Sequence, residues 1–433
     1  MIHSNIIPFI YFKLTVILKN LEIKMKKKTA LIKTLLTVSS AIVLSACLGN
    51  AEPQQESSKL PEDTPVSSST TSIQFAKKMQ AGWNLGNTFD AQSEGSKENK
   101  GVSTETSWGM PYTTQSMIKA VAAKGFKTIR IPVSWHNHIT DSNLTIDPQW
   151  LSRIKTVTDY AINEGMYVII NIHHDNLTSA KLSTTYGYTV NTNTAEQETS
   201  RKYITAVWKQ VAEYFKEYNQ NLIFELLNEP RNRDSANDGF TAPENISDLN
   251  KVISSYNQAA LNAIRASGSK NTDRFIMVPY YAASPYDSVN WTVPNDSAAD
   301  KLLIAVHAYC PYDFCMNTTA DSTFEDDDEG NDISYLFSLL KSQWVSKGYG
   351  VVMGEASASD KNNTAERLKW VKYYYKKAKQ SSVPVILWDN MNISTASGGY
   401  GDINSGECHG YFNRKNCSWW FEPLIDEMIS ISK

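Results

Sequence analysis

Two glutamates, Glu229 and Glu355, stand where the chain could bring a pair of carboxyl groups together. Glu229 follows the apolar run LIFELL at residues 222–227, and Glu355 follows the run GVVMG at residues 350–354. Short apolar runs without a helical period are typical of buried strands. Two carboxyl groups at one site can divide a reaction between them, because one can donate a proton while the other attacks.

A third glutamate, Glu225, lies within the first of these runs. The alternation of a strand sends it to the same side as Glu229, but deeper in the protein. Because a buried carboxylate needs a partner, we expect a structural role for Glu225, with a partner that the sequence does not identify. By itself, the tripeptide Asn228-Glu229-Pro230 could equally be an ordinary polar turn after a strand.

From Ser72 to the C-terminus, candidate strands alternate with amphipathic helical patterns. The strands are expected at Gly82–Asn87, Thr128–Val133, Tyr167–Ile172, Leu222–Glu229, Arg274–Pro279, Leu302–Tyr309, Gly350–Glu355 and Val383–Asp389. Helical patterns cover Thr114–Lys124, Trp150–Ile162, Tyr203–Tyr218, Asp248–Ser267, Ile333–Ser346, Thr364–Lys379 and Ser418–Ser430, and only the connection after the fifth strand lacks a clear one. This alternation predicts an α/β fold, a (β/α)8 TIM barrel in a single catalytic domain over residues 72–433. A doubly wound sheet would show a glycine-rich first turn. The segment GWNLGN (residues 82–87) lacks the glycine spacing of a dinucleotide-binding turn.

Polar and aromatic residues stand toward the C-terminal ends of six of the expected strands, where such a barrel forms its active site. They are Arg130 for the second strand, His173 and His174 for the third, Asn228 and Glu229 for the fourth, His307 and Tyr309 for the sixth, Glu355 for the seventh and Trp388 for the eighth. A single histidine at a strand end is usually structural. Six such groups on one rim predict a catalytic site.

Glutamates on the fourth and seventh strands would face each other across the barrel mouth. Retaining glycoside hydrolysis needs this arrangement, because an acid protonates the leaving oxygen while a carboxylate about 5–5.5 Å away attacks the anomeric carbon. We expect the different surroundings of the two carboxyl groups to push their pKa values apart, that of Glu355 downward and that of Glu229 upward, so that Glu229 keeps its proton near neutral pH. Supporting roles suit Arg130 and Tyr309 beside the nucleophile Glu355, Asn228 at a sugar 2-hydroxyl and Trp388 as a flat platform.

Residues 72–433 resemble glycoside hydrolase family 5, the large cellulase family of (β/α)8 barrels. The pattern of that family is an arginine, a histidine, Asn-Glu, His-x-Tyr, a glutamate and a tryptophan, and it falls on Arg130, His173, Asn228, Glu229, His307, Tyr309, Glu355 and Trp388. The resemblance implies that Glu229 is the acid/base, that Glu355 is the nucleophile and that no cofactor is needed. His174 is the alternative to His173 as the family's histidine.

Three segments are similar to subfamily 4: GWNLGNTFDA (residues 82–91), NIHHD (171–175) and HAYCPYDFC (307–315). This implies activity on β-1,4-glucans, mixed-linkage glucan or xyloglucan. Asp175 stands where the family usually has glutamate, which we interpret as peripheral to the chemistry. Four residues could line the subsites for the retained sugars, although each tryptophan could equally be core: Trp83, Asn84, Asn87 and Trp135.

The leading hypothesis is a retaining endo-β-1,4-glucanase that forms a covalent glycosyl-enzyme intermediate and uses neither cofactor nor metal. The alternatives are a xyloglucanase, lichenase or mannanase, a non-catalytic glycan-binding lipoprotein, and a metal-dependent hydrolase. The acidic run 325–329 could hold calcium, but such runs are usually solvated loops. A net charge of −3 gives no reason to expect nucleic acid as a partner, so the expected partner is a β-glucan.

The N-terminal region has the features of an export signal. Five lysines between residues 24 and 33 precede an apolar run at residues 35–46, which is short for a membrane span. Leu-Ser-Ala-Cys at residues 44–47 resembles a bacterial lipobox, which implies a signal peptide at 25–46 and lipid on Cys47. Residues 1–24 are then sequence upstream of the true start at Met25, or alternatively an uncleaved anchor.

Residues 47–71 are poor in apolar side chains and predict a disordered tether. The expected product is an exported, monomeric lipoprotein of the bacterial cell surface or outer membrane, held to the membrane by its lipid alone. The four remaining cysteines could form two disulfides, Cys310 with Cys315 and Cys408 with Cys417 as local pairs, although three connectivities are possible. No cysteine or histidine spacing typical of zinc occurs.

Overall fold

The computed structural model describes residues 67, 69–317, 320, 322–325, 329–399 and 408–433. The expected signal peptide, Cys47 and nearly all of the tether therefore lie outside the described residues, as do residues 326–328 of the acidic run. The compact unit that contains the barrel spans Ser57–Lys433. Within the described part of the chain, no helix combines the length and apolar character needed to cross a membrane.

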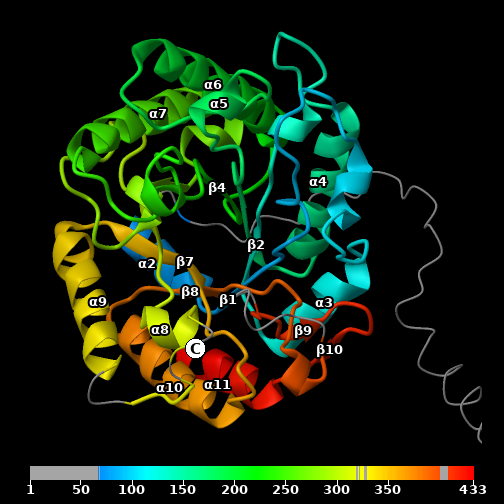
Figure 1. The fold of residues 1–433 in the computed structure, drawn as a ribbon, viewed down its shortest axis with the longest axis vertical. Coiled ribbons are helices and arrows are strands. Elements are labelled where there is room, and N and C mark those ends of the chain that lie inside the picture. The colour runs from blue at the N-terminus through cyan, green and yellow to red at the C-terminus, as the bar shows by residue number, and fades with distance from the viewer. Residues whose placement is uncertain (1–66, 68, 318–319, 321, 326–328, 400–407) are drawn as a thin grey trace, which may run out of the picture. The chain divides into compact units, whose positions relative to one another are not determined.

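Eight parallel strands close into a barrel in chain order, so that the first strand pairs with both the second and the eighth (Figure 1). The strands are β1 (Gly82–Asn84), β2 (Thr128–Ile131), β3 (Tyr167–Asn171), β4 (Leu222–Glu225), β5 (Ile276–Pro279), β6 (Leu302–His307), β7 (Gly350–Ala356) and β8 (Val385–Leu387). The predicted α/β (β/α)8 TIM barrel is thus confirmed. Most strands end earlier than predicted, because the ladder stops where the chain turns outward at the rim.

Helices surround the barrel and connect successive strands (Figure 1). They are α3 (Gln115–Lys124), α4 (Pro148–Asn163), α5 (Ser179–Leu182), α6 (Thr194–Phe215), α7 (Ile246–Ala266), α8 (Tyr312–Cys315), α9 (Glu329–Gln343), α10 (Thr364–Gln380) and α11 (Glu422–Ser432). The longer helices bury a face at helical spacing, as Trp150, Ile154 and Val157 do on α4. The connection from β5 to β6, described over its whole length, has only a 3₁₀ turn at Tyr281–Ala283, which agrees with the sequence.

The last helix begins later than its pattern predicted. Instead of starting the helix, Ser418–Trp419 form the short strand β10, which pairs antiparallel with β9 (Phe412–Asn413). The ring of Trp419 lies 4.7 Å from that of Phe412 and 5.5 Å from that of Phe126, centroid to centroid. These aromatic contacts with distant residues override the local helical preference, which the sequence pattern alone could not reveal.

The barrel interior is apolar near the N-terminal ends of the strands and polar near their C-terminal ends. Six side chains of the apolar part come from six strands: Ile169, Ile223, Met277, Leu303, Val352 and Ile386. Their strand neighbours, such as Val168 and Ile170, belong to the larger cluster that packs under the helices. In the polar part Arg130 and Glu225 are fully buried, so the barrel places charged groups directly above an apolar floor.

Helix α2 (Ser72–Met79) closes the N-terminal end of the barrel. Phe75 is fully buried and stacks on Phe275 with ring centroids 3.8 Å apart. The backbone N–H of Gly350 donates to the hydroxyl of Ser72 at 2.9 Å. A side chain at Gly350 would come within 2.4 Å of the Ser72 carbonyl oxygen, so this close approach requires glycine.

The four cysteines expected to form disulfides lie in the C-terminal half of the barrel. Cys310, Cys315 and Cys408 are buried and Cys417 is partly exposed. The pairings of Cys310 with Cys315 and of Cys408 with Cys417 stay predictions.

Phe75→Ala should lower the free energy of unfolding by about 3–5 kcal/mol, because it leaves a cavity between α2 and the barrel floor. Denaturant unfolding followed by circular dichroism measures the change. Lys77→Ala, an exposed site on the same helix, is the control and should change stability by less than about 0.5 kcal/mol. Equal midpoints for the two variants would show that α2 does not seal the barrel.

Candidate active site

The residues predicted at the strand ends gather in a cleft of about 1000 Å³ at the C-terminal mouth of the barrel. Nine of them line it: Asn87, His173, His174, Asn228, Glu229, His307, Tyr309, Glu355 and Trp388. The tenth, Arg130, is fully buried and bonds to two of them. This set comes from strands β1 to β4 and β6 to β8, or from the residues directly after them. Closure of the barrel therefore brings the set together.

Arg130 on β2 joins three other parts of the rim. Its Nη1 donates to Oε1 of Glu355 at 2.7 Å and to Oδ1 of Asn84 at 3.0 Å. Its Nε donates to Oε2 of Glu225 at 2.7 Å, and its Nη2 to Oδ1 of Asn228 at 2.6 Å. Burial lowers the pKa of Arg130, but the charges of Glu225 and Glu355 outweigh burial and raise it. Arg130 is therefore a permanent cation within the site.

Glu355 is held at both carboxylate oxygens. Oε1 accepts from Arg130, and Oε2 accepts from the hydroxyl of Tyr309 at 2.9 Å. The preceding residue, Gly354, lies so close to His307 that a Cβ there would be 2.9 Å from its Nε2. Glycine at this position thus lets the imidazole of His307 lie against the β7 backbone.

His307 is the second cation of the site and lies between three carboxylates. Its Nδ1 is 2.8 Å from Oε1 of Glu229 and 3.7 Å from Oε1 of Glu355, and its Nε2 is 3.8 Å from Oε1 of Glu225. Burial lowers the pKa of His307, but the three carboxylates outweigh burial and raise it to about 9. The imidazole is therefore protonated at neutral pH.

The predicted rise in the pKa of Glu229 is wrong for the free protein. Burial does raise it, but the hydrogen bond with His307 and the charges of His307, Arg231 and Arg130 together lower the pKa of Glu229 below its ordinary value. The sequence prediction did not include the cation that β6 places beside this carboxylate. Glu229 and His307 consequently share one proton, which rests on the imidazole when the cleft contains no substrate.

The structure identifies the partners of Glu225, which the sequence did not. Its Oε2 accepts from Arg130 and, at 2.8 Å, from Nδ2 of Asn171. Asn171 also lies 3.1 Å from Nδ1 of His173. Burial raises the pKa of Glu225, but Arg130 and His307 outweigh burial and lower it. As expected, Glu225 is structural, because it holds Arg130 and Asn171 beneath the cleft.

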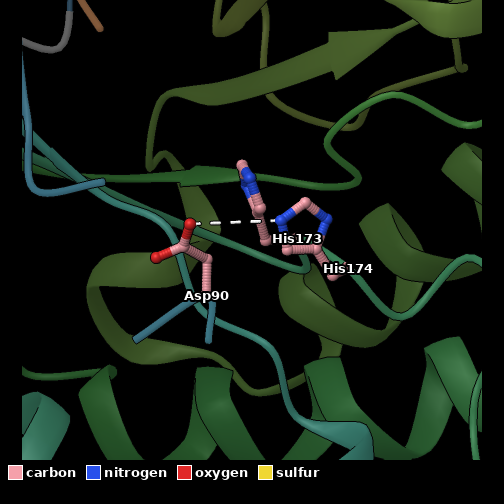
Figure 2. Close-up of side chains that lie close together, drawn as sticks. All are labelled: Asp90, His173 and His174. Carbon is pink, nitrogen blue, oxygen red and sulfur yellow. Dashed lines mark ion pairs between the residues drawn. The ribbon is translucent and has the colours of Figure 1, made fainter. Parts of the chain in front are cut away.

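Asp90, His173 and His174 lie close together at one side of the site (Figure 2). Nε2 of His174 is 4.0 Å from Oδ2 of Asp90, as the dashed line shows. The ring of His173 is parallel to that of Trp388 at 6.0 Å between centroids. Burial is the main cause that lowers the pKa of His174 to about 4, and it also holds the pKa of His173 well below its ordinary value. Both imidazoles are therefore neutral and can exchange hydrogen bonds with sugar hydroxyls.

Sequence analysis missed Asp90, although it lies in the segment that resembles subfamily 4. Its carboxylate accepts from the backbone N–H groups of Asn87 at 3.0 Å and Thr88 at 2.7 Å. It thereby fixes the loop that carries Asn87 into the cleft. Burial raises the pKa of Asp90 to about 6.

Three residues considered for sugar subsites do not line the cleft. Trp83 and Trp135 are almost completely buried, and their indole N–H groups donate to Asp389 and to the carbonyl of Asn171, each at 2.8 Å. Asn84 is also buried and bonds to Arg130. These side chains belong to the framework, and only Asn87 of the four reaches the cleft.

Asp175, the departure from the family pattern, is fully buried and supports the loop after β3. It accepts from the backbone N–H of Trp135, from Nδ1 of His136 and from the hydroxyl of Tyr203. None of these residues lines the cleft. The interpretation of Asp175 as peripheral to the chemistry therefore agrees with its position.

Arg231 is a further site residue that the sequence analysis missed. Its Nη1 lies 3.7 Å from Oε2 of Glu229, and its guanidinium covers the ring of Phe240 at 3.8 Å. Its place directly after the Asn-Glu-Pro segment was the available signal. Arg231 adds positive charge beside the acid/base and lines the cleft together with Phe240.

Among the residues that the structure describes, two groups of three side chains have metal-ligand chemistry: Asp90 with His173 and His174, and Glu229 with His307 and Glu355. The carboxylates of both groups already have protein partners. Both oxygens of Asp90 accept backbone N–H groups, both oxygens of Glu355 accept from Arg130 and Tyr309, and Glu229 pairs with His307. A metal ion would have to displace a protein cation from the second group, so this donor set favours acid–base chemistry without a metal.

The fold and the site together define a hydrolytic barrel enzyme with two facing carboxyl groups. The sequence model described as cellulase (glycosyl hydrolase family 5) matches residues 89–394, and the chain belongs to this family. It is 36% identical over 378 residues to Endoglucanase B of Ruminococcus albus, covering 84% of each chain. It is 33% identical to Endoglucanase A of Clostridium longisporum, covering 93% of this chain and 72% of that protein.

Solved structures agree with this assignment. A glycoside hydrolase 5 lichenase from a Caldicellulosiruptor species, in complex with cellotetraose, superposes with a TM-score of 0.76 at 37% identity, covering 88% of this chain and 99% of that one. A GH5-4 broad-specificity endoglucanase from Ruminococcus champanellensis with bound cellotriose superposes with a TM-score of 0.74 at 34% identity. The match covers 83% of this chain and 98% of that one. The protein is therefore a glycoside hydrolase of the cellulase type, and the resemblance seen in the sequence is confirmed.

The charge of Glu355 is the largest influence that raises the pKa of His307. NMR titration of the histidine rings should show His307 deprotonating near pH 9, and Glu355→Gln should move this titration to lower pH because an anion that stabilises the imidazolium is lost. Glu213→Gln, at an exposed site on α6, should leave it in place. An unchanged titration in Glu355→Gln would refute the coupling.

Dialysis against EDTA should leave kcat/KM on soluble β-glucan unchanged, because hydrogen-bond donors of the protein already occupy the carboxylate oxygens. Activity is assayed before dialysis, after dialysis and after addition of Mg²⁺, Ca²⁺ or Zn²⁺. A loss that a metal ion restores would show that a metal takes part.

Proposed function

We propose that this chain is an endo-β-1,4-glucanase that retains anomeric configuration through a covalent glycosyl-enzyme intermediate on Glu355. The observation that supports retention is the approach of Glu229 and Glu355, whose nearest carboxylate oxygens lie within 4.8 Å of each other. Retaining enzymes hold these groups about 5–5.5 Å apart, whereas inverting enzymes need about 6.5–9.5 Å to admit a water molecule. The spacing therefore favours direct attack by a carboxylate.

In the first half of the reaction, Glu355 attacks the anomeric carbon, the glycosidic C–O bond breaks, and Glu229 protonates the leaving oxygen. His307 supplies that proton along its 2.8 Å hydrogen bond to Glu229. In the second half, Glu229 takes a proton from water, whose oxygen attacks the same carbon and releases Glu355. Glu229 then passes this proton back to His307, which restores the starting state. Two inversions at one carbon retain its configuration.

The neighbouring groups serve this sequence of steps. Arg130 and Tyr309 orient Glu355 and stabilise the charge that returns to it in the second half. Because Arg130 occupies Oδ1 of Asn228, the Nδ2 of this amide is turned to donate to a sugar 2-hydroxyl. The ring of Trp388 provides a flat surface for the sugar that is attacked.

The choice of β-glucan as substrate rests on the relatives, which are endoglucanases and a lichenase, and on the cellotriose and cellotetraose in the solved neighbours. Rates on cellulose derivatives, mixed-linkage glucan, xyloglucan and mannan would separate the endoglucanase from the xyloglucanase, lichenase and mannanase alternatives. A non-catalytic glycan-binding role is less well supported, because the acid, the nucleophile and their hydrogen-bonded partners are all in place.

Glu355→Ala should lower kcat by several orders of magnitude, and azide should partly restore cleavage of an activated aryl glycoside. The small anion can enter the space left by the carboxylate and attack from the same face, giving an α-glycosyl azide. Glu229→Ala is the matched control, since azide there attacks the glycosyl-enzyme and gives the β product. NMR of the products distinguishes the two. Near-normal activity of these variants on β-glucan polysaccharide, whose leaving oxygen needs a proton, would contradict the assignment.

We further propose that the protein is an exported, monomeric lipoprotein of the bacterial surface, with lipid on Cys47 and a flexible tether at residues 47–71. The support is the lysine-rich start, the apolar run and the Leu-Ser-Ala-Cys sequence of residues 44–47.

Cys47→Ser should move the protein from the membrane fraction to the soluble fraction and leave kcat on soluble glucan unchanged, because the tether separates lipid from barrel. Fractionation followed by immunoblotting and activity assay checks this. Continued membrane retention would point instead to an uncleaved anchor within residues 1–46.

A further inference from the structure

The cleft carries more exposed aromatic surface than the bond-breaking chemistry uses. Nine large hydrophobic side chains are exposed among the described residues, and five of them line this cleft. The five are Trp108, Phe240, Tyr286, Tyr312 and Tyr335. Aromatic faces match the apolar face of a sugar ring, so their concentration here indicates a ligand that extends well beyond the two carboxyl groups.

Tyr286 and Tyr335 form a matched pair within this set. Tyr286 belongs to the connection between β5 and β6, whereas Tyr335 belongs to α9. Their rings are parallel to within 6°, with centroids 6.3 Å apart, and the two residues are 50% and 62% exposed. Two separate elements thus hold their rings in one orientation toward the cleft, and neither ring takes part in the chemistry proposed above.

The position of this pair relative to the scissile bond follows from the order of strands around the rim. Trp388 after β8 and Asn87 after β1 lie on one arc, together with Trp108, whose ring is 5.7 Å from that of His174. The sugar attacked by Glu355 rests on Trp388, so the retained half of the chain occupies this arc.

The opposite arc carries the residues that follow β4, β5 and β6. Arg231 and Phe240 follow Glu229 along the chain, and Tyr286 and Tyr335 line the cleft beyond them. Because Glu229 protonates the oxygen of the leaving half, that half must extend along this arc.

We propose that Tyr286 and Tyr335 bind the leaving half of a β-1,4-glucan, one or two sugars beyond the bond that is cut, and thereby set the cleavage position along the chain. This inference rests on the proposed function. Each aromatic platform favours occupation of its subsite about fivefold. Removing a platform therefore shifts the bound glucan toward the Trp388 arc, and the reacting groups stay unaltered.

Hydrolysis of cellohexaose in ¹⁸O-labelled water tests this directly. The new oxygen enters only the retained fragment, so mass spectrometry assigns each product to one half and reports which bond was cut. Tyr286→Ala and Tyr335→Ala should each increase, about fivefold, the share of cuts that release a shorter leaving fragment. The corresponding phenylalanine variants keep the ring and should cut as the wild type does.

Two controls define the outcome. Tyr214→Ala removes a tyrosine that is 41% exposed on α6 and does not line the cleft, so its cleavage pattern should equal that of the wild type. Trp108→Ala should shift the pattern toward longer leaving fragments. A wild-type pattern in both tyrosine-to-alanine variants, or a shift in the same direction as Trp108→Ala, would overturn the inference. A wild-type enzyme that cuts no β-1,4-glucan would instead overturn the proposed function.

Discussion

The buried guanidinium of Arg130 is the interaction on which the rest of the site depends. It reaches Glu225 on β4, Asn228 after β4, Glu355 on β7 and Asn84 on β1. Burying an ion costs several kcal/mol unless opposite charges and hydrogen bonds compensate. The carboxylates offset the cost of burying the charge of Arg130, and Arg130 offsets the cost of burying theirs. The barrel mouth can therefore hold ionised groups in a dry interior only as a connected set.

The same balance explains how one pair of glutamates can perform two tasks. Glu355 is bonded to Arg130 and Tyr309, whereas Glu229 is bonded to His307. One carboxylate thus faces a cation that never loses its proton, and the other faces a cation that can transfer one. The different partners, rather than burial of the two residues, distinguish nucleophile from acid. Farther out the cleft changes from buried charges to exposed aromatic rings, which suits a long neutral chain better than a small ion.

Much of this could be predicted from the chain itself. Eight apolar runs alternating with amphipathic patterns determine a parallel barrel, because such strands can be buried on both faces only when helices surround them. The barrel rule then places every strand end on one rim, so Glu229 and Glu355 could be paired although they lie 126 positions apart in the chain. Local patterns were misleading where distant packing decided, as at Trp419, and where an aromatic residue could be either core or cleft, as at Trp83 and Trp135.

What the sequence by itself determined is therefore the fold, the reacting pair and most of their companions, because these follow from strand order and residue type. Only the tertiary structure decided the partners of each charge: His307 and Arg231 beside Glu229, and Arg130 and Asn171 beside Glu225. It also decided which exposed aromatic rings share one surface, as Tyr286 and Tyr335 do. Electrostatic energies and ring contacts depend on distances of a few ångströms between residues far apart in the chain, and such distances exist only after the barrel has closed.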